Sequence, residues 1–285
     1  MMLLRHTRRH SWGLLLSCLT AFVPGGMQAQ ARPERVASLN LCTDQLLLAL
    51  ADRSQIASLS RLARDPSIAF LADQAAAVPV NDGSAEAIVF EGPDLVLTGT
   101  YGQREQIALL TREGFDVLSL GPWEDLADGR NQIRTLARRL GHPERAEALI
   151  AQIDAALDRA RGIVPRGRSI LSLERGGWVT APRSPLGEVL VHMGFKLHQE
   201  DLGLAQGGMA RLEAIVTTPP DFMLVDAASS RAVDNGTALL LHPALAEAVP
   251  STRRLALPGK LTICGGPATP VAIDQLTVEV LAKVR

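Results

Sequence analysis

The sequence predicts an α/β protein of two Rossmann-like lobes with parallel sheets, joined by one long rigid α-helix. Two observations predict this fold. From residue 35 onward, short apolar segments alternate with helical segments, which is typical of βαβ crossovers and a mostly parallel sheet. The same alternating order of strands and helices then repeats after residue 165, which indicates two halves of like construction.

Each half contains predicted strands separated by helices. In the first half the strands are 35–40, 55–59, 94–97 and 115–120, with helices at 43–51, after Ser84 and at 103–113. In the second half the strands are 168–174, 195–198, 222–226 and 254–257, with helices at 185–193, around Glu213 and ending near Val249. The two halves therefore have the same predicted order of elements.

One repeated segment makes the duplication explicit. EAIVFEGPDLVL begins at Glu86, and EAIVTTPPDFML begins at Glu213. Both contain Glu-Ala-Ile-Val, three further residues, Pro-Asp, two apolar residues and Leu. This pattern is typical of a helix that packs on a sheet and turns through Pro-Asp into a buried strand. Its recurrence supports two lobes of similar build.

A helical region lies between the two halves. A helix over 124–140 is predicted to end at Gly141, and the next helix begins at Pro143 and runs to about Arg161. Nearly twenty helical residues at ~1.5 Å each reach ~30 Å, which is enough to bridge two lobes as a stiff strut. The expected organisation is a signal peptide, an N-terminal lobe, a connecting helix and a C-terminal lobe, at residues 1–31, 32–141, 142–163 and 164–285.

The first residues have the features of a secretory signal. Three arginines precede an apolar run at residues 12–23, and the tripeptide that ends at Ala31 has the small residues of a cleavage site. The run is shorter than the ~20 apolar residues that span a bilayer. We therefore expect cleavage near Ala31 and a mature protein in the periplasm. The alternative, a lipoprotein anchored through Cys18, ranks lower because apolar residues continue past that cysteine.

The charge of the mature chain is close to balanced. The full chain has 29 Lys and Arg against 30 Asp and Glu; residues 1–31 hold three of the arginines and no acid, so their removal changes the net charge from −1 to −4. A protein that binds nucleic acid presents a basic face. We therefore expect no nucleic-acid partner.

The tyrosine and both tryptophans of the mature chain lie where a ligand is expected. In open α/β sheets, ligands bind beyond the carboxyl ends of the strands. The loops that meet this condition are 40–44, 99–104, 121–123, 174–178, 226–231 and 264–266. Tyr101, Trp123 and Trp178 all lie in these loops. Large flat side chains suit a macrocycle or an aryl chelate, and packing at the edge of a lobe is the alternative for each.

Arginines and cysteines occupy the same loops. Arg104, Arg175 and Arg231 lie in or beside them, and guanidinium groups suit the carboxylates of haem or the charge of a ferric chelate. Cys42 and Cys264 lie there too, one in each half. Three roles stay open for this pair: a disulfide that ties the lobes, free thiols that contact a metal chelate, or inert buried cysteines.

Five features in order carry a resemblance to a known family. They are RVASLNLCTDQLLLALAD, EAIVFEGPDLVLTGTYG, the long connecting helix, EAIVTTPPDFMLV and HPALAEAVPSTRRLALPGK. Together they resemble the helical-backbone class (class III) of periplasmic substrate-binding proteins, which serve ABC importers for ferric siderophores, haem and cobalamin. The resemblance covers essentially the whole mature chain. It implies two α/β lobes, one connecting helix, a ligand in the cleft and little hinge motion.

The resemblance also implies a docking partner. Members of this class use one exposed glutamate in each lobe to contact arginines of the permease, and Glu86 and Glu213 occupy the matching positions. The alternative is that each is a first-turn acid that stabilises its helix by ~0.3–1 kcal/mol. We expect a monomer that docks on an ABC permease dimer in the inner membrane through these glutamates.

The expected function is capture of an iron chelate (siderophore or haem) or of cobalamin for import, with no catalytic residues and no resident cofactor or metal. An iron chelate ranks first because arginines accompany the aromatic residues. Tyr101 is a candidate axial ligand to haem iron, because of its loop position.

Two other classes of protein are alternatives. A secreted α/β enzyme is disfavoured because the sequence has no G-x-S-x-G, H-E-x-x-H or Gly-rich loop ending in Lys-Ser/Thr. A binder of free zinc or manganese needs several histidines and carboxylates that converge on one ion. The histidines of the mature chain are dispersed: His142, His192, His198 and His242.

Overall fold

The computed structural model describes residues 32–228 and 234–284. The predicted signal peptide, with Cys18 and the cleavage site near Ala31, lies outside the described residues, as does the candidate ligand residue Arg231. From residue 32 onward the chain forms one compact unit. Within the described ranges, no helix combines the length and the hydropathy that crossing a bilayer requires.

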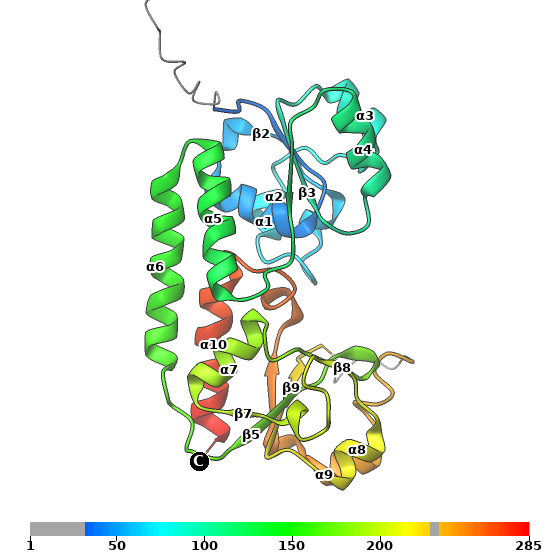
Figure 1. Ribbon diagram of the computed structural model, residues 1–285, viewed down its shortest axis with the longest axis vertical. Helices are drawn as coiled ribbons and strands as arrows, with labels where there is room; N and C mark the ends of the chain where they lie inside the picture. The colour runs from blue at the N-terminus through cyan, green and yellow to red at the C-terminus, as the bar shows by residue number, and fades with distance from the viewer. Residues whose placement is uncertain (1–31, 229–233, 285) are drawn as a thin grey trace, which may run out of the picture. The chain divides into compact units, whose positions relative to one another are not determined.

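Two four-stranded parallel sheets form the two lobes (Figure 1). The first sheet has the spatial order β2 (Ile56–Ser58), β1 (Val36–Ser38), β3 (Leu95–Gly99) and β4 (Val117–Leu120). The second has the order β7 (Lys196–Leu197), β5 (Ser169–Ser172), β9 (Phe222–Asp226) and β10 (Arg254–Leu257). When the strands are counted within their own four-stranded sheet, both sheets read second, first, third, fourth. This shared topology confirms the predicted duplicated α/β fold.

The helices fall into groups by lobe. The first lobe has α1 (Leu41–Leu50), α2 (Ala72–Ala75), α3 (Ala85–Glu91) and α4 (Arg104–Arg112). The second has α7 (Pro185–Met193), α8 (Leu212–Thr217) and α9 (Pro243–Ala248), with an antiparallel ribbon of β6 (Trp178–Val179) and β8 (Gly208–Met209). The remaining helices are α5 (Leu126–Leu140), α6 (Pro143–Ala160) and the last helix α10 (Ala268–Lys283). The sequence patterns did not predict α2, the ribbon or α10.

Capping residues set the helix limits where the sequence predicted them. The Ser84 side chain accepts a hydrogen bond from the Ala87 N–H at 3.2 Å and so begins α3. Gly141 ends α5 with a positive φ of 82°, which glycine adopts without a steric penalty. Pro143 occupies the first turn of α6, where its missing N–H costs nothing.

The repeated Pro-Asp pair has the same structural role in both lobes. The Asp94 carboxylate accepts hydrogen bonds from the N–H groups of Glu34 (2.8 Å) and Arg35 (3.0 Å), just before β1. The Asp221 carboxylate accepts one from the N–H of Ser169 (2.8 Å), at the start of β5. Each aspartate therefore fixes the beginning of the strand beside its own, and this explains why the pair recurs.

The connecting helix α6 packs against both α5 and α10 (Figure 1). Its predicted apolar stripe is buried and consists of Ala146, Ile150, Ile153, Leu157 and Ala160. Arg159 on α6 pairs with Asp274 on α10 at 2.8 Å. One hydrophobic core runs through these helices and into both sheets. The lobe boundaries at residues 141 and 163 stay a prediction, because the described chain forms a single unit.

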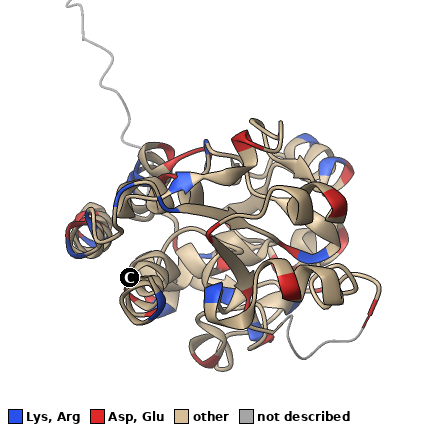
Figure 2. Ribbon diagram, turned by 90° about the horizontal axis from the view of Figure 1, so that it is seen from below, with Lys and Arg blue, Asp and Glu red and all other residues tan. Residues whose placement is uncertain are grey.

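Charged side chains are mixed in sign over the part of the chain that the structure describes. In the view of Figure 2, Lys and Arg are interspersed with Asp and Glu along the elements. Several are paired across elements, as Arg134 is with Glu147 at 2.7 Å. The absence of a nucleic-acid partner stays a prediction.

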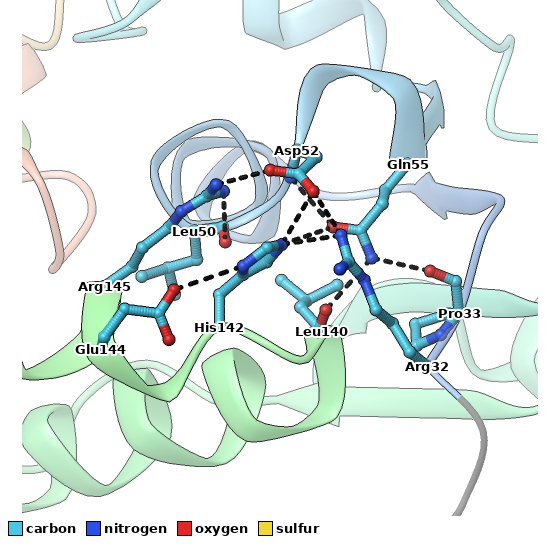
Figure 3. Close-up of polar contacts among 9 residues, drawn as sticks. All are labelled: Arg32, Pro33, Leu50, Asp52, Gln55, Leu140, His142, Glu144 and Arg145. Atoms are coloured by element: carbon cyan, nitrogen blue, oxygen red, sulfur yellow. Dashed lines mark hydrogen bonds and ion pairs between the residues drawn. The ribbon is translucent and has the colours of Figure 1, made fainter.

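A buried histidine joins the start of the described chain to the turn between α5 and α6 (Figure 3). His142 is 7% exposed, and its Nε2 lies 3.1 Å from Gln55 Oε1 and 2.9 Å from Arg32 Nη2. The Gln55 amide donates to the carbonyls of Pro33 at 2.7 Å and Leu140 at 3.1 Å. These bonds hold residues 32 and 33 against the turn.

Charged groups surround the same histidine. Asp52, just after α1, pairs with Arg32 and with Arg145 (Figure 3). Hydrogen bonds from Arg145 and Arg32 lower the pKa of the Asp52 carboxyl to about 2. Glu144 lies 3.4 Å from His142 Nδ1. We name Arg32, Asp52, Gln55, His142, Glu144 and Arg145 the His142 cluster.

Candidate ligand-binding site

A cavity of about 460 Å³ lies at the carboxyl ends of strands from both sheets. This volume is within the ~300–1,000 Å³ typical of small-molecule sites. Its lining takes residues that end or follow β1, β3, β4, β5 and β10, including Asn40, Gly99, Gly121, Glu174 and Leu257. The cavity therefore lies where the carboxyl-end rule places a ligand.

Helices α7 and α10 complete the wall with apolar side chains. The apolar residues they contribute include Leu186, Val189, Ala272, Ile273 and Leu276. Sequence reasoning missed these positions because it searched the strand ends and did not predict α10. Gln132 of α5 also lines the cavity but lies on a helix and not at a strand end. No sequence motif marks a helix face that turns toward a cavity, so this residue was missed.

The lining is largely uncharged. Glu174 is the one acidic residue in it, and Lys, Arg and His are absent from the lining among the described residues. The Glu174 carboxylate accepts a hydrogen bond from the Thr180 hydroxyl at 2.9 Å. The other polar groups are hydroxyls and amides, which bind a ligand by hydrogen bonds rather than by charge. The lining residues of this kind include Asn40, Thr43, Thr100, Gln132 and Thr262.

The predicted aromatic residues divide into two groups. Tyr101, the only tyrosine of the chain, lines the cavity and is 72% exposed. Trp123 also lines it, while its ring packs against the backbone of Gly129 and Gly265. Trp178 lies outside the lining, on the exposed face of the ribbon, where it pairs with Met209. Trp123 thus packs against its neighbours and also faces the cavity, and its contact with a ligand stays a prediction.

The two predicted arginines that the structure describes, Arg104 and Arg175, lie outside the cavity lining. Arg175 pairs with Asp234 at 2.9 Å, and its guanidinium lies against Gly236, so its charge is compensated away from the cavity. Arg104 is exposed at the start of α4. The third, Arg231, is outside the described residues. Contact of these arginines with a ligand stays a prediction. No arginine is among the described residues that line the cavity.

Cys42 and Cys264 form a disulfide with a Cα–Cα distance of 5.1 Å. Of the three roles that the sequence left open, the structure selects the covalent bond, and this rules out free thiols at this site. Both residues also line the cavity. Four of the eight candidate ligand residues therefore meet at one cavity: Cys42, Tyr101, Trp123 and Cys264.

A buried carboxyl lies directly behind this wall. Asp44 of α1 is fully buried and accepts hydrogen bonds from the Ser60 N–H (3.1 Å) and hydroxyl (2.5 Å). Loss of hydration on burial raises the pKa of Asp44 to about 7, against the opposing effect of these hydrogen bonds. Asp44 is outside the lining, and its side chain connects α1 to Ser60, which follows β2.

Glu86 and Glu213 occupy matched positions in the two lobes. Each lies in the first turn of its helix, α3 or α8, and each is exposed. Exposure is compatible with both roles proposed for them, permease docking and stabilisation of the helix dipole. Docking stays a prediction.

The histidines near the second sheet contact backbone carbonyls. His192 Nε2 lies 2.7 Å from the Leu157 carbonyl, and His198 Nε2 lies 2.7 Å from the Thr218 carbonyl. Among residues 32–228 and 234–284, no group of three or more His, Cys, Asp or Glu is arranged to hold a metal ion. The free-metal alternative therefore has no supporting cluster in that part of the chain.

Comparisons with solved structures give the same fold. The periplasmic heme-binding protein RhuT of Roseiflexus sp. RS-1 is 24% identical, with a TM-score of 0.68 over 88% of this chain and 99% of that one. A periplasmic heme-binding protein of Pseudomonas aeruginosa is 22% identical, with a TM-score of 0.62 over 88% and 93%. A periplasmic binding protein of Veillonella parvula is 15% identical, with a TM-score of 0.68 over 88% and 92%.

Comparison of the sequence with protein families supplies the assignment. No curated protein sequence matches the chain. The family model described as periplasmic binding protein matches residues 36–261, which includes both sheets and the connecting helix. The chain therefore belongs to the periplasmic binding protein family, in its two-lobed helical-backbone class.

Proposed function

We propose that this protein is the periplasmic solute-binding component of an ABC import system, which captures a bulky metal chelate and delivers it to a permease. The observation that carries the proposal is the cavity of about 460 Å³ whose walls come from the strand ends of both lobes. A site of this kind encloses a small molecule between two bodies. Family membership supports binding and transport over catalysis.

An iron chelate is the first candidate ligand. Two structural neighbours are described as heme-binding proteins. Tyr101 places a phenol at the cavity, and a tyrosine oxygen is one of the axial ligands that proteins give to haem iron. Trp123 and the apolar faces of α7 and α10 suit a flat ring system.

Cobalamin is the second candidate, and the charge of the lining favours it. Haem carries two propionates, which cationic side chains usually balance. The described lining contains Glu174 and no Lys, Arg or His. Cobalamin carries amide groups in place of free carboxylates, and the hydroxyls and amides of this cavity can pair with them.

Delivery requires a docking surface. Glu86 and Glu213 are exposed at equivalent places on the two lobes, and we propose that they contact arginines of a permease dimer. In the proposed role the binding protein acts as a monomer, without a cofactor or metal of its own beyond the transported chelate.

Thermal-shift screening of the purified mature protein tests the proposal. Hemin, ferric siderophores and cyanocobalamin are the probes. A ligand present at about 100 times its Kd adds about 2.7 kcal/mol of stability, which raises Tm by roughly 5–10 °C in a protein of this size. Stabilisation by none of these, but by a nucleotide or a bare divalent ion, would point to the enzyme or free-metal alternatives.

Tyr101→Phe separates the two ligand classes. If hemin binds through the phenolate, the variant loses the Soret and charge-transfer bands of tyrosinate-bound ferric haem, and its affinity for hemin falls. Cyanocobalamin binding should change much less. An unchanged Soret spectrum with unchanged hemin affinity rejects the axial role of Tyr101.

A further inference from the structure

A loop from the second lobe forms part of the cavity while lying on the first lobe. After β10 the chain passes through a short 3₁₀ helix, Gly259–Leu261, and reaches residues 262–266, which we name the tethered loop. Its Cys264 is bonded to Cys42 in α1 and belongs to one buried cluster with residues of α1 and α2. The tethered loop is therefore attached to one lobe by sequence and to the other by a covalent bond.

Close packing fixes the tethered loop beside this bond. A methyl group at Gly265 would overlap the Trp123 ring. A methyl group at Gly266 would lie 2.8 Å from Leu46 Cδ2, well inside van der Waals contact. Backbone approaches this close leave no space for the loop to shift without moving its neighbours.

Trp123 connects the loop to the cavity wall. Its ring contacts Gly265 of the tethered loop and Gly129 of α5, and the same side chain lines the cavity. Four residues of the loop also line the cavity: Thr262, Ile263, Cys264 and Gly265. A displacement of the loop therefore changes the shape of the cavity directly, and again through Trp123.

The loop is also bonded to the beginning of α10. The Gly266 N–H donates a hydrogen bond to Thr269 Oγ1 at 3.0 Å, within the first turn of that helix. Thr269 and Ile273 of α10 line the cavity, and α10 packs along α6. The disulfide thus fixes one end of a helix that runs beside the connecting helix.

We propose that the Cys42–Cys264 disulfide is a positioning pair for the ligand site, holding the tethered loop and Trp123 where they complete the cavity. Without the bond, the loop must be ordered at the moment of binding, and that ordering reduces affinity. A disulfide-free protein that is still folded should bind ligand roughly tenfold more weakly or worse. This consequence for affinity rests on the proposed function; the position of Trp123 does not.

Tryptophan fluorescence tests the positioning without any ligand. In a Trp178→Phe background, Trp123 is the only tryptophan of the mature chain. Adding Cys42→Ser and Cys264→Ser should move its emission to longer wavelength and increase quenching by acrylamide, with an unchanged far-UV circular dichroism spectrum. Identical emission and quenching with and without the disulfide overturn the proposal.

Ligand titrations test the consequence for binding. Hemin and cyanocobalamin are titrated into the oxidised protein and into the Cys42→Ser, Cys264→Ser variant, both with Trp178 in place. The probe that binds the oxidised protein should bind the variant roughly tenfold more weakly, and equal affinities overturn the proposal. If hemin, cyanocobalamin and ferric siderophores all fail to bind the oxidised protein, the proposed function fails, while the Trp123 fluorescence still decides the positioning role.

A second variant keeps the test decisive if the disulfide-free protein does not fold. Gly265→Ala retains the disulfide but forces the Trp123 ring to move. Gly121→Ala is the matched control, because it also changes a cavity glycine but meets Thr100 Oγ1 at an ordinary 3.4 Å. Gly265→Ala should reproduce the emission shift and the loss of affinity, whereas Gly121→Ala should leave the emission of Trp123 unchanged. Wild-type behaviour of Gly265→Ala overturns the proposal.

Discussion

The two ends of helix α1 are fastened by different chemistry. At its start, Cys42 is covalently bonded to Cys264, which is 222 residues away and 6% exposed. Just after its end, Asp52 pairs with Arg32 and Arg145 in the His142 cluster (Figure 3), where each of these side chains is about a third or more exposed. One attachment is apolar and faces the cavity; the other is ionic and reaches solvent.

The attachments at the two ends of α1 should therefore respond to different changes in solution conditions. A disulfide is insensitive to salt and to moderate changes of pH, and it responds to reductants. Exposed ion pairs are screened by salt and respond to acid. Because the ligand cavity is at the disulfide end, changes there should alter binding and stability together. Changes in the His142 cluster should alter stability alone.

Removal of the disulfide should have the largest effect on stability. Cys42→Ser with Cys264→Ser should lower the free energy of unfolding by ~2–5 kcal/mol, because the bond closes a very long loop and so restricts the unfolded chain. Guanidinium chloride unfolding under oxidising conditions measures the loss, with urea at low and high NaCl as a check. A loss below ~1 kcal/mol, or one that changes strongly with salt, would contradict the comparison.

Asp44, near the disulfide end, should make stability fall as pH rises. Its pKa is about 7 in the folded protein and near 3.8 in the unfolded chain, so the folded state holds the proton more tightly. The cost appears between pH 4 and pH 7 and is at most ~4 kcal/mol. Urea unfolding at pH 5 and pH 8 measures it, and Asp44→Asn should remove most of the difference. The same decline in the variant would assign it to another group.

Gln55→Ala should show what the His142 cluster contributes through hydrogen bonds. Gln55 is buried. Its side chain donates hydrogen bonds to the carbonyls of Pro33 (2.7 Å) and Leu140 (3.1 Å) and accepts one from the N–H of Asp52 (2.9 Å). Leaving buried backbone groups unpaired should lower the free energy of unfolding by ~1–3 kcal/mol. Affinity for whichever probe binds should stay at the wild-type value, since the cavity is elsewhere. A matching loss of affinity would show that the two ends of α1 are coupled.

Asp52→Asn should have the smallest effect and the opposite dependence on pH. The folded pKa of Asp52, about 2, lies below its usual 3.8, so its contribution is present above about pH 4 and is lost as pH falls toward 2. The variant should be slightly less stable than wild type at neutral pH and should lose less stability between pH 4 and 2. Acid unfolding followed by circular dichroism compares the two, and parallel curves over this range would refute the assignment.

Sequence patterns predicted the elements that have strong local signals. The limits of β9 and α7 agree with the predicted segments, as do the cap at Gly141 and the start at Pro143. The helix α10 was missed because its buried residues, Ile273, Leu276 and Val280, alternate with exposed apolar ones such as Val278 and Leu281. No single apolar stripe is visible in such a segment. The strands of the ribbon, two residues each, are too short for any period.

The candidate site was predicted in its location and only partly in its residues. Strand-end loops are visible in a sequence, so Tyr101 and Trp123 were found there. The partner of Arg175 is Asp234, 59 residues along the chain, and nothing local signals that pair. The disulfide was one of three alternatives for the same reason, since the distance between Cys42 and Cys264 is a property of the fold. Contacts between distant segments decided what local pattern left open.

The origin of the cavity walls has a mechanical consequence. A ligand in this cavity would contact residues of both lobes, so its binding energy would also hold the lobes together. Release of the ligand breaks these contacts, and the minimum work of release under standard conditions equals the standard free energy of binding. In the proposed import role, tighter binding therefore raises the work that the permease must do to release the ligand.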